Sequence, residues 1–111
     1  MSPSIDAVLR HILEEVDFLI GSAATTDRAG FLADEALRRA WVRSLEVIGE
    51  AAKQLPTDFR QAHPEVDWRG MAGMRDRLIH GYFAVDYELV WEVATAKVSD
   101  LRQPIAALLD D

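Results

Sequence analysis

The apolar residues near the start of the chain repeat with the period of an α-helix. Between residues 4 and 20 they fall three or four positions apart, at Ile5, Val8, Leu9, Ile12, Val16, Leu19 and Ile20. A stripe of this kind predicts an amphipathic helix with one face in a core. Ser4 is the expected N-cap of this helix, and Gly21 is its expected C-cap.

The same period returns in the middle of the chain. The small and polar stretch at 21–30 predicts a loop, and a longer helix is predicted to follow Asp34. Its apolar seam steps by four and three residues through Leu37, Trp41, Ser44, Ile48, Ala51 and Leu55. Pro56 is expected to end this helix. The spacing is typical of helices that pack antiparallel in a bundle.

The remainder of the chain predicts three more helical segments, at 57–63, 68–79 and 87–109. Their expected N-caps are Thr57, Asp67 and Asp86. Gly70 and Gly73 weaken the second segment and permit close approach of another backbone or a ligand. Pro104 is expected to kink or divide the third segment. Because no stretch alternates with a period of two, the pattern predicts an all-α fold with four main helices in a small bundle.

Composition narrows the class of protein. The chain has 111 residues, so we expect a single domain over 1–111. Its formal net charge of −7 argues against a protein that coats nucleic acid or anionic membranes by bulk charge. It contains no cysteine, which excludes thiolate metal sites and cysteine nucleophiles. No segment resembles a signal peptide or a membrane span, so we expect a soluble cytoplasmic protein without a membrane partner.

The residues with candidate chemistry lie in the segment 70–82. Residues 60–80 contain four arginines and three acids, a local charge of +1, so the rest of the chain carries −8. A locally basic patch of this kind can bind a phosphate backbone. Arg75 is a candidate clamp for a phosphate or a transition state, and His80 is a candidate proton-transfer group.

Helical geometry constrains how these side chains meet. At about 100° per residue, Arg75 and His80 lie about 140° apart on an ideal helix. They meet only if the helix breaks near Gly81 or if a second subunit completes the site. Asp76 and His80 are four residues apart and would share a face, so Asp76 is a candidate to orient the imidazole. Arg75 or Arg77 is expected to pair with Asp76.

Polar residues of the preceding long helix are further candidates. Arg43 and Glu46 either line the site or form an ion pair at the rim of a dimer. Glu50 is a candidate buried polar group that faces the 70–82 segment.

The segment from Arg75 to Tyr82, RDRLIHGY, is similar to the R-x-x-x-x-H-x-Y motif of HepT-like proteins in the HEPN superfamily. The resemblance continues through the stretch RSLEVIGEAA at 43–52, PEVDW at 64–68, GMR at 73–75 and VDYELVW at 85–91. Together these blocks extend over about residues 5–109. The motif alone is moderately specific, but the motif with these flanking blocks in this order is strongly specific.

The resemblance implies a single HepT-like domain, a four- or five-helix antiparallel bundle. It implies a homodimer in which two motif copies face a shared cleft. It further implies the toxin of a prokaryotic toxin–antitoxin pair, a ribonuclease that acts on RNA without a metal or other cofactor, with Arg75 and His80 as the catalytic residues and Asp76 and Tyr82 in support. The implied partner is an MntA-like nucleotidyltransferase antitoxin that neutralises the toxin by AMPylation of Tyr82.

A second interpretation comes from the charge of the chain. The domain is then a catalytically silent module that binds nucleotide or RNA, or acts as a scaffold for a nucleotidyltransferase. The net charge of −7 favours this alternative, because a nuclease gains from a positive field.

Overall fold

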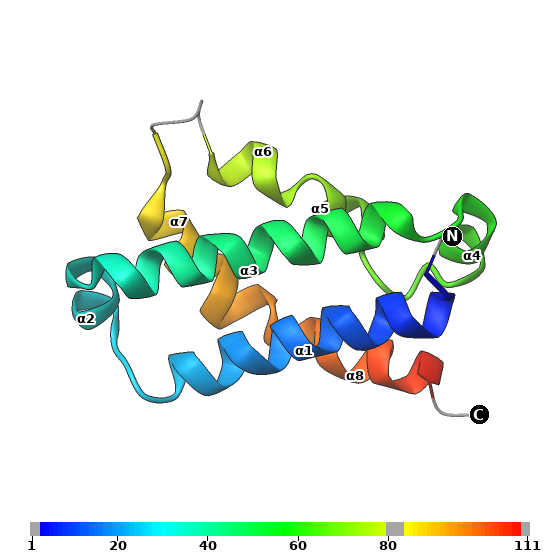
Figure 1. Cartoon of the computed structure of the whole chain (residues 1–111), viewed down its shortest axis with the longest axis horizontal. Helices are drawn as coiled ribbons and strands as arrows, with labels where there is room; N and C mark the ends of the chain where they lie inside the picture. Colours follow the sequence, from blue (N-terminus) through cyan, green and yellow to red (C-terminus); the bar gives the residue numbers. More distant parts are fainter. Residues whose placement is uncertain (1–2, 80–83, 110–111) are drawn as a thin grey trace.

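Two long antiparallel helices form one wall of the molecule. The computed structural model describes residues 3–79 and 84–109. Helix α1 spans Ile5–Ala23 and α3 spans Glu35–Gln54, and the two lie side by side over most of their length (Figure 1). Their predicted positions are confirmed, including the end of α3 just before Pro56.

Two interrupted helical arms complete the bundle. The first returns along α3 as α5, Trp68–Ala72, and α6, Met74–Leu78. The second runs back as α7, Tyr87–Glu92, a π-helical turn η1, Val93–Lys97, and α8, Ser99–Leu109, which packs on α1.

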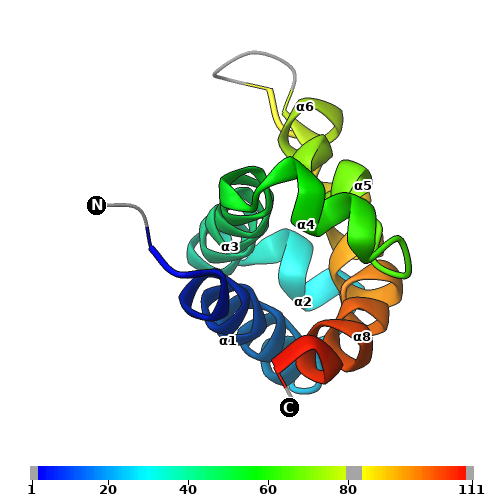
Figure 2. The ribbon, with the colours of Figure 1, turned by 90° about the vertical axis from the view of Figure 1, so that its right-hand side faces the viewer.

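Short helices α2, Arg28–Ala33, and α4, Thr57–Ala62, lie at opposite ends of the long helices (Figures 1 and 2). The described part of the chain forms no strand beyond one isolated antiparallel bridge between Ile79 and Val85. The predicted all-α antiparallel bundle is therefore confirmed.

The core lies between the two long helices and the two interrupted helical arms. Each contributes fully buried apolar side chains, among them Ile12, Leu19, Trp41, Ile48, Met71, Leu78, Val90 and Ile105. Near α2, the rings of Phe31, Trp41 and Trp91 form a cluster, and the Trp41 and Trp91 indoles stack with centroids 5.5 Å apart. Aromatic clusters of this size contribute a large share of the buried apolar area of a small domain.

Three predicted N-caps are confirmed by hydrogen bonds. The side-chain oxygens of Ser4, Asp67 and Asp86 each accept a backbone N–H three residues ahead, over 2.9–3.1 Å. Asp34, for which no cap was predicted, accepts the Leu37 N–H at 3.0 Å in the same way. Each bond satisfies one of the free N–H groups at a helix start. The fourth predicted cap, Thr57, is wrong: Thr57 is the first residue of α4, and Pro56 precedes it without a side-chain cap.

The end of α1 differs from its prediction. The helix continues through Gly21 to Ala23, so Gly21 is an interior residue rather than the C-cap. The additional turn is held by a tertiary contact, because the Trp41 indole N–H donates to the Ser22 hydroxyl at 2.8 Å.

The predicted loop at 21–30 also contains the start of a helix. Asp27 accepts the Gly30 N–H at 2.7 Å and caps α2, and buried Phe31 anchors α2 in the aromatic cluster.

The predicted helix at 68–79 is two helices. Gly73 breaks it, donating its N–H to the Arg69 and Met71 carbonyls at the end of α5. The close backbone approach expected at Gly70 or Gly73 occurs instead at Gly49 of α3. A Cβ at Gly49 would lie 2.8 Å from the Met71 carbonyl oxygen. The absence of a side chain at Gly49 therefore lets α5 rest directly on the α3 backbone.

The C-terminal arm is irregular at a different place from the one predicted. Pro104 lies inside α8, which runs without a break from Ser99 to Leu109. The irregularity is η1, where the Val98 N–H donates to the Val93 carbonyl at 3.0 Å. This wider turn keeps Val90, Val93, Ala94 and Val98 in the core.

Candidate active site

Helix α6 presents three consecutive charged residues to solvent. Met74 and Leu78 are one turn apart and buried, so they fix the inner face of α6. The residues between them, Arg75, Asp76 and Arg77, consequently point outward and are exposed. Arg75 keeps 51% of its side chain accessible, so its guanidinium can be reached by a ligand in solution.

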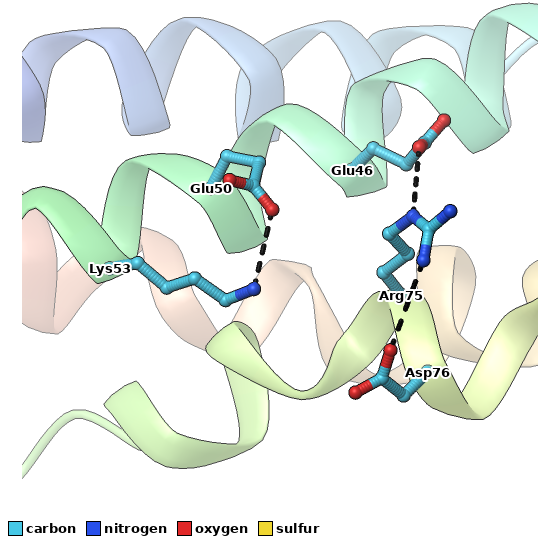
Figure 3. Close-up of polar contacts among 5 residues, drawn as sticks. All are labelled: Glu46, Glu50, Lys53, Arg75 and Asp76. Carbon is cyan, nitrogen blue, oxygen red and sulfur yellow. Dashed lines mark hydrogen bonds and ion pairs between the residues drawn. The ribbon is translucent and has the colours of Figure 1, made fainter.

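A carboxylate of the neighbouring helix holds Arg75. The Arg75 Nε lies 3.5 Å from Oε2 of Glu46 on α3, and its Nη1 lies 4.0 Å from Oδ1 of Asp76 (Figure 3). Glu46 is the more buried of the two acids, with 29% of its side chain accessible, against 86% for Asp76. Surface ion pairs contribute little to stability, so the main consequence of the Glu46 contact is the orientation of the guanidinium.

The structure bears differently on the predictions for the polar residues of α3. Glu46 contacts Arg75, while the other alternative for Glu46 and Arg43, an ion pair at the rim of a dimer, stays a prediction. The prediction of a buried Glu50 is wrong: its side chain is exposed and pairs with Lys53 at 3.3 Å on the same helix (Figure 3). The pairing of Asp76 with Arg75 is confirmed at the outer limit of an ion pair.

Helix α6 ends before the second motif residue. Leu78 is its last residue, and Ile79 is extended and bridged to Val85. The predicted helical face shared by Asp76 and His80 is therefore wrong, because the helix does not reach residue 80. The required break between Arg75 and His80 occurs after Leu78, earlier than the expected position at Gly81. His80 and Tyr82 themselves lie outside the described residues.

The Asp86 N–H donates to the Leu78 carbonyl at 2.9 Å, next to the Ile79–Val85 bridge. These contacts place Ile79 and Val85, which flank residues 80–83 in the sequence, next to each other at the end of α6 and the start of α7.

The site lies on an open surface rather than in a deep cavity. A depression of about 700 Å³ lies between α4 and α5 and is lined by Arg60 and Arg69 but not by Arg75. Within residues 3–79 and 84–109, no three His, Asp or Glu side chains gather closely enough to hold a metal ion. No helix in the same part of the chain is long and apolar enough to cross a membrane.

The sequence of the chain matches a known protein family. The profile of the family described as "Ribonuclease HepT-like" matches residues 9–108. The chain is 46% identical over 101 residues to a "Putative RNase" of Caldanaerobacter subterraneus subsp. tengcongensis, across 91% of this chain and 90% of that protein. It is 47% identical over 72 residues to the "Probable ribonuclease HepT" of Thermococcus cleftensis, across 65% of this chain and 66% of that protein.

A "Putative RNase" of Methanocaldococcus jannaschii is 40% identical to the chain over 107 residues, across 96% of this chain and 88% of that protein. No solved structure matches the sequence. The profile match and the relatives matched over 101 and 107 residues extend through α6, where Arg75 is exposed beside Glu46. The chain belongs to the HepT-like ribonuclease family.

Proposed function

We propose that the chain is a metal-independent ribonuclease whose reaction centre contains Arg75 and His80. The observation that carries the proposal is the Arg75 side chain, held by Glu46 on a packed helix and still half exposed. A fixed and accessible guanidinium suits the recognition of a phosphodiester. The family membership and the names of the relatives support the same chemistry.

In the proposed reaction, the 2′-hydroxyl oxygen of RNA attacks the adjacent phosphorus, and the bond to the 5′-oxygen breaks. His80 removes the proton from the 2′-hydroxyl as a base or supplies the proton to the departing 5′-oxygen as an acid. Arg75 stabilises the negative charge that develops on the phosphorane. The products are a 2′,3′-cyclic phosphate and a 5′-hydroxyl.

The proposal is tested by RNA cleavage in the presence of EDTA. The wild-type chain should cleave, while Arg75→Ala and His80→Ala should each lose about 100-fold or more of the rate. Arg102→Ala is the matched control, because Arg102 is also half exposed and pairs with one carboxylate of another helix, Asp17, at 2.7 Å. Cleavage that survives in both site variants would refute the proposal, and cleavage abolished by EDTA would refute its metal independence.

We further propose that the chain is the toxin of a toxin–antitoxin pair, a homodimer inhibited by an MntA-like nucleotidyltransferase that AMPylates Tyr82. Tyr82 is two residues beyond His80 in the sequence. A phosphate attached there would introduce negative charge where the RNA phosphate is expected to bind, and so compete with it.

This regulation is tested by the intact mass of the chain after co-expression with an MntA-like nucleotidyltransferase. Added AMP units that disappear in Tyr82→Phe are the expected result. An unchanged mass would contradict the proposal, and the inhibitor would then act by another route, such as occlusion of the site.

One observation favours a second candidate, a silent module that binds RNA or nucleotide. The net charge of −7 gives a domain that repels RNA over most of its surface. Such a module would bind RNA without cleaving it. In the cleavage assay the RNA would therefore stay intact with the wild type and with both site variants.

A further inference from the structure

The hollow of about 700 Å³ between α4 and α5 is separate from the Arg75 side chain. Figure 2 shows the two helices that enclose it, next to α3. Pockets that hold a small organic ligand usually measure about 300–1,000 Å³. The hollow is therefore large enough to receive a nucleotide base.

The turn that joins α4 to α5 gives the hollow a fixed wall. Val66 and Trp68 are buried in this turn, and the Trp68 indole N–H donates to the His63 carbonyl at 2.9 Å. The ring centroid of Phe59 lies 4.6 Å from that of His63 and 6.1 Å from that of Trp68. Because these contacts form the wall before a ligand binds, little ordering cost remains for the binding step.

Two arginines supply the hollow with hydrogen-bond donors. Arg60 of α4 and Arg69 of α5 both line it, and neither forms an ion pair with another described residue. The Nε of Arg60 is buried without a partner among the described residues, and its Nη2 reaches only the Thr57 hydroxyl, at 3.4 Å. A guanidinium carries five N–H donors, so Arg60 can donate several more hydrogen bonds to a ligand.

Two carboxylates line the same hollow, those of Glu65 and Asp67. Asp67 is engaged at the start of α5, where its Oδ1 accepts the Gly70 N–H at 2.9 Å. Glu65 is half exposed, and its Oε2 lies 3.4 Å from the Nδ1 of His63. The two arginines and two carboxylates of the lining sum to a formal charge of zero. The interior of the hollow therefore does not favour a phosphate, which the two carboxylates repel.

The lining matches instead a neutral group that both accepts and donates hydrogen bonds. The bases of single-stranded RNA have this character and are recognised by hydrogen bonds to their edges. Guanine fits this set of partners: its O6 and N7 accept both arms of an arginine fork, and its N1–H and N2–H donate in parallel to one carboxylate. Adenine and cytosine offer a carboxylate one amino group, and uracil offers it one N–H.

We propose that this hollow is a guanine-binding subsite that positions RNA on the Arg75 site. Arg60 donates to O6 and N7 of the base, Glu65 accepts its N1–H and N2–H, and the exposed Arg69 contacts the adjoining phosphate. Arg69 is six residues before Arg75, and six helical residues are about 9 Å long. Since a strand advances about 3.4 Å per nucleotide, the bound guanine lies within about three nucleotides of the cleaved bond.

Base binding is tested without catalysis, by fluorescence anisotropy with uridine heptamers made uncleavable by 2′-O-methylation. The wild type should bind a heptamer with one central guanosine about tenfold more tightly than the all-uridine heptamer. Replacement of that guanine by 7-deazaguanine, which lacks the N7 acceptor, should remove most of the difference. Arg60→Lys keeps the charge but loses the fork, so it should bind both heptamers alike. Arg39→Lys, at an exposed arginine paired with Glu35 on α3, is the control that should keep the preference.

Glu65→Gln supplies a second variant that does not disturb the core, because the Glu65 side chain is half exposed. The wild type should bind the guanosine heptamer more tightly than one with inosine, which lacks the N2 amino group. Glu65→Gln should lose this discrimination, because an amide accepts through one oxygen only. Equal affinity of the wild type for the guanosine and all-uridine heptamers would overturn the subsite, and so would a guanine preference retained in both Arg60→Lys and Glu65→Gln.

The role of the subsite in cleavage rests on the proposed ribonuclease, and it is measured separately on a uridine-rich RNA with one guanosine. The wild type should cut at a fixed offset from the guanosine, and Arg60→Lys should cut without that offset. Cleavage by the wild type with no fixed offset would overturn the subsite and leave the ribonuclease standing. Guanine-selective binding without any cleavage would support the guanine site and overturn the ribonuclease.

Discussion

Single hydrogen bonds between distant residues fix several parts of this bundle. The Trp41 ring is fully buried in the aromatic cluster, and its one polar group, the indole N–H, reaches the Ser22 hydroxyl. A buried donor that loses its acceptor costs more than an ordinary hydrogen bond contributes. Ser22 therefore has a stabilising role that its position near a helix end does not suggest.

We predict that Ser22→Ala destabilises the fold by about 1–3 kcal/mol, because the indole N–H would remain buried without a partner. Urea denaturation of the variant against the wild type measures the change. Ser99→Ala, at an exposed position on α8, should alter stability by no more than about 0.5 kcal/mol. Equal stability of the two variants would show that the indole finds another acceptor.

At the site, Glu46 sets the orientation of the Arg75 guanidinium. Glu46 contacts the Nε of Arg75 and leaves its Nη groups for a ligand, apart from the distant Asp76. Loss of the Glu46 charge has two opposing effects on a phosphate. It frees the guanidinium to rotate, which weakens catalysis, and it removes a nearby negative charge, which favours binding.

We predict that Glu46→Gln lowers kcat for RNA cleavage by about tenfold and changes KM by less than about threefold. In the Arg75→Ala background the same substitution should have no further effect, since the two residues act as a unit. Glu50→Gln is the matched control, one turn away on α3 and paired with Lys53. An equal loss in both backgrounds would show that Glu46 acts through the fold and not through Arg75.

At the scale of elements, the contact between α3 and α5 depends on one missing side chain. Gly49 is a poor choice for a helix interior by intrinsic propensity. It is required here because the Met71 carbonyl occupies the position of a Cβ. Gly21 is also inside a helix, but nothing lies within 4 Å of its Cβ position.

Substitution of the two glycines by alanine should therefore change the stability of the fold in opposite directions. Gly49→Ala should destabilise the fold by about 1–3 kcal/mol, because α5 must move away from α3. Gly21→Ala should stabilise it by up to about 1 kcal/mol, the difference in helix propensity. Chemical denaturation of both variants measures the signs, and a stabilising Gly49→Ala would mean that the backbones are not in contact.

The local sequence predicted the existence of the elements better than their ends. Helix α1, helix α3 and the C-terminal arm follow from apolar periodicity, and their starts follow from residues such as Asp34 and Asp86 that bond within one turn. The break at Gly73 and the π-turn at Val93 depend on packing against other helices. The Glu46–Arg75 pair joins two separate helices, so no local pattern contains it.

For the whole molecule, charge limits where RNA can bind. The chain carries −7 overall, and the exposed cations of α5 and α6 are Arg69, Arg75 and Arg77. The remaining surface repels a polyanion. Binding through so few cations releases few counterions, so its dependence on salt is shallow compared with that of a protein that coats nucleic acid.

We predict that the affinity for a single-stranded RNA made uncleavable by 2′-O-methylation falls with salt with a log–log slope of about −1.4 to −2.1 per chain, for two or three phosphate contacts. Fluorescence anisotropy over a salt series measures the slope. The Arg77→Ala variant should reduce its magnitude by about 0.7. A slope steeper than about −4 would indicate a basic surface that the described residues do not provide.

By itself the sequence determined the all-α class, the positions of the long helices and three of the N-caps. These features depend on contacts within one or two helical turns, which spacing records. The tertiary structure decided where the helices stop, which glycine admits another backbone and which acid holds Arg75. Those outcomes depend on residues far apart along the chain, whose contacts exist only once the bundle has packed.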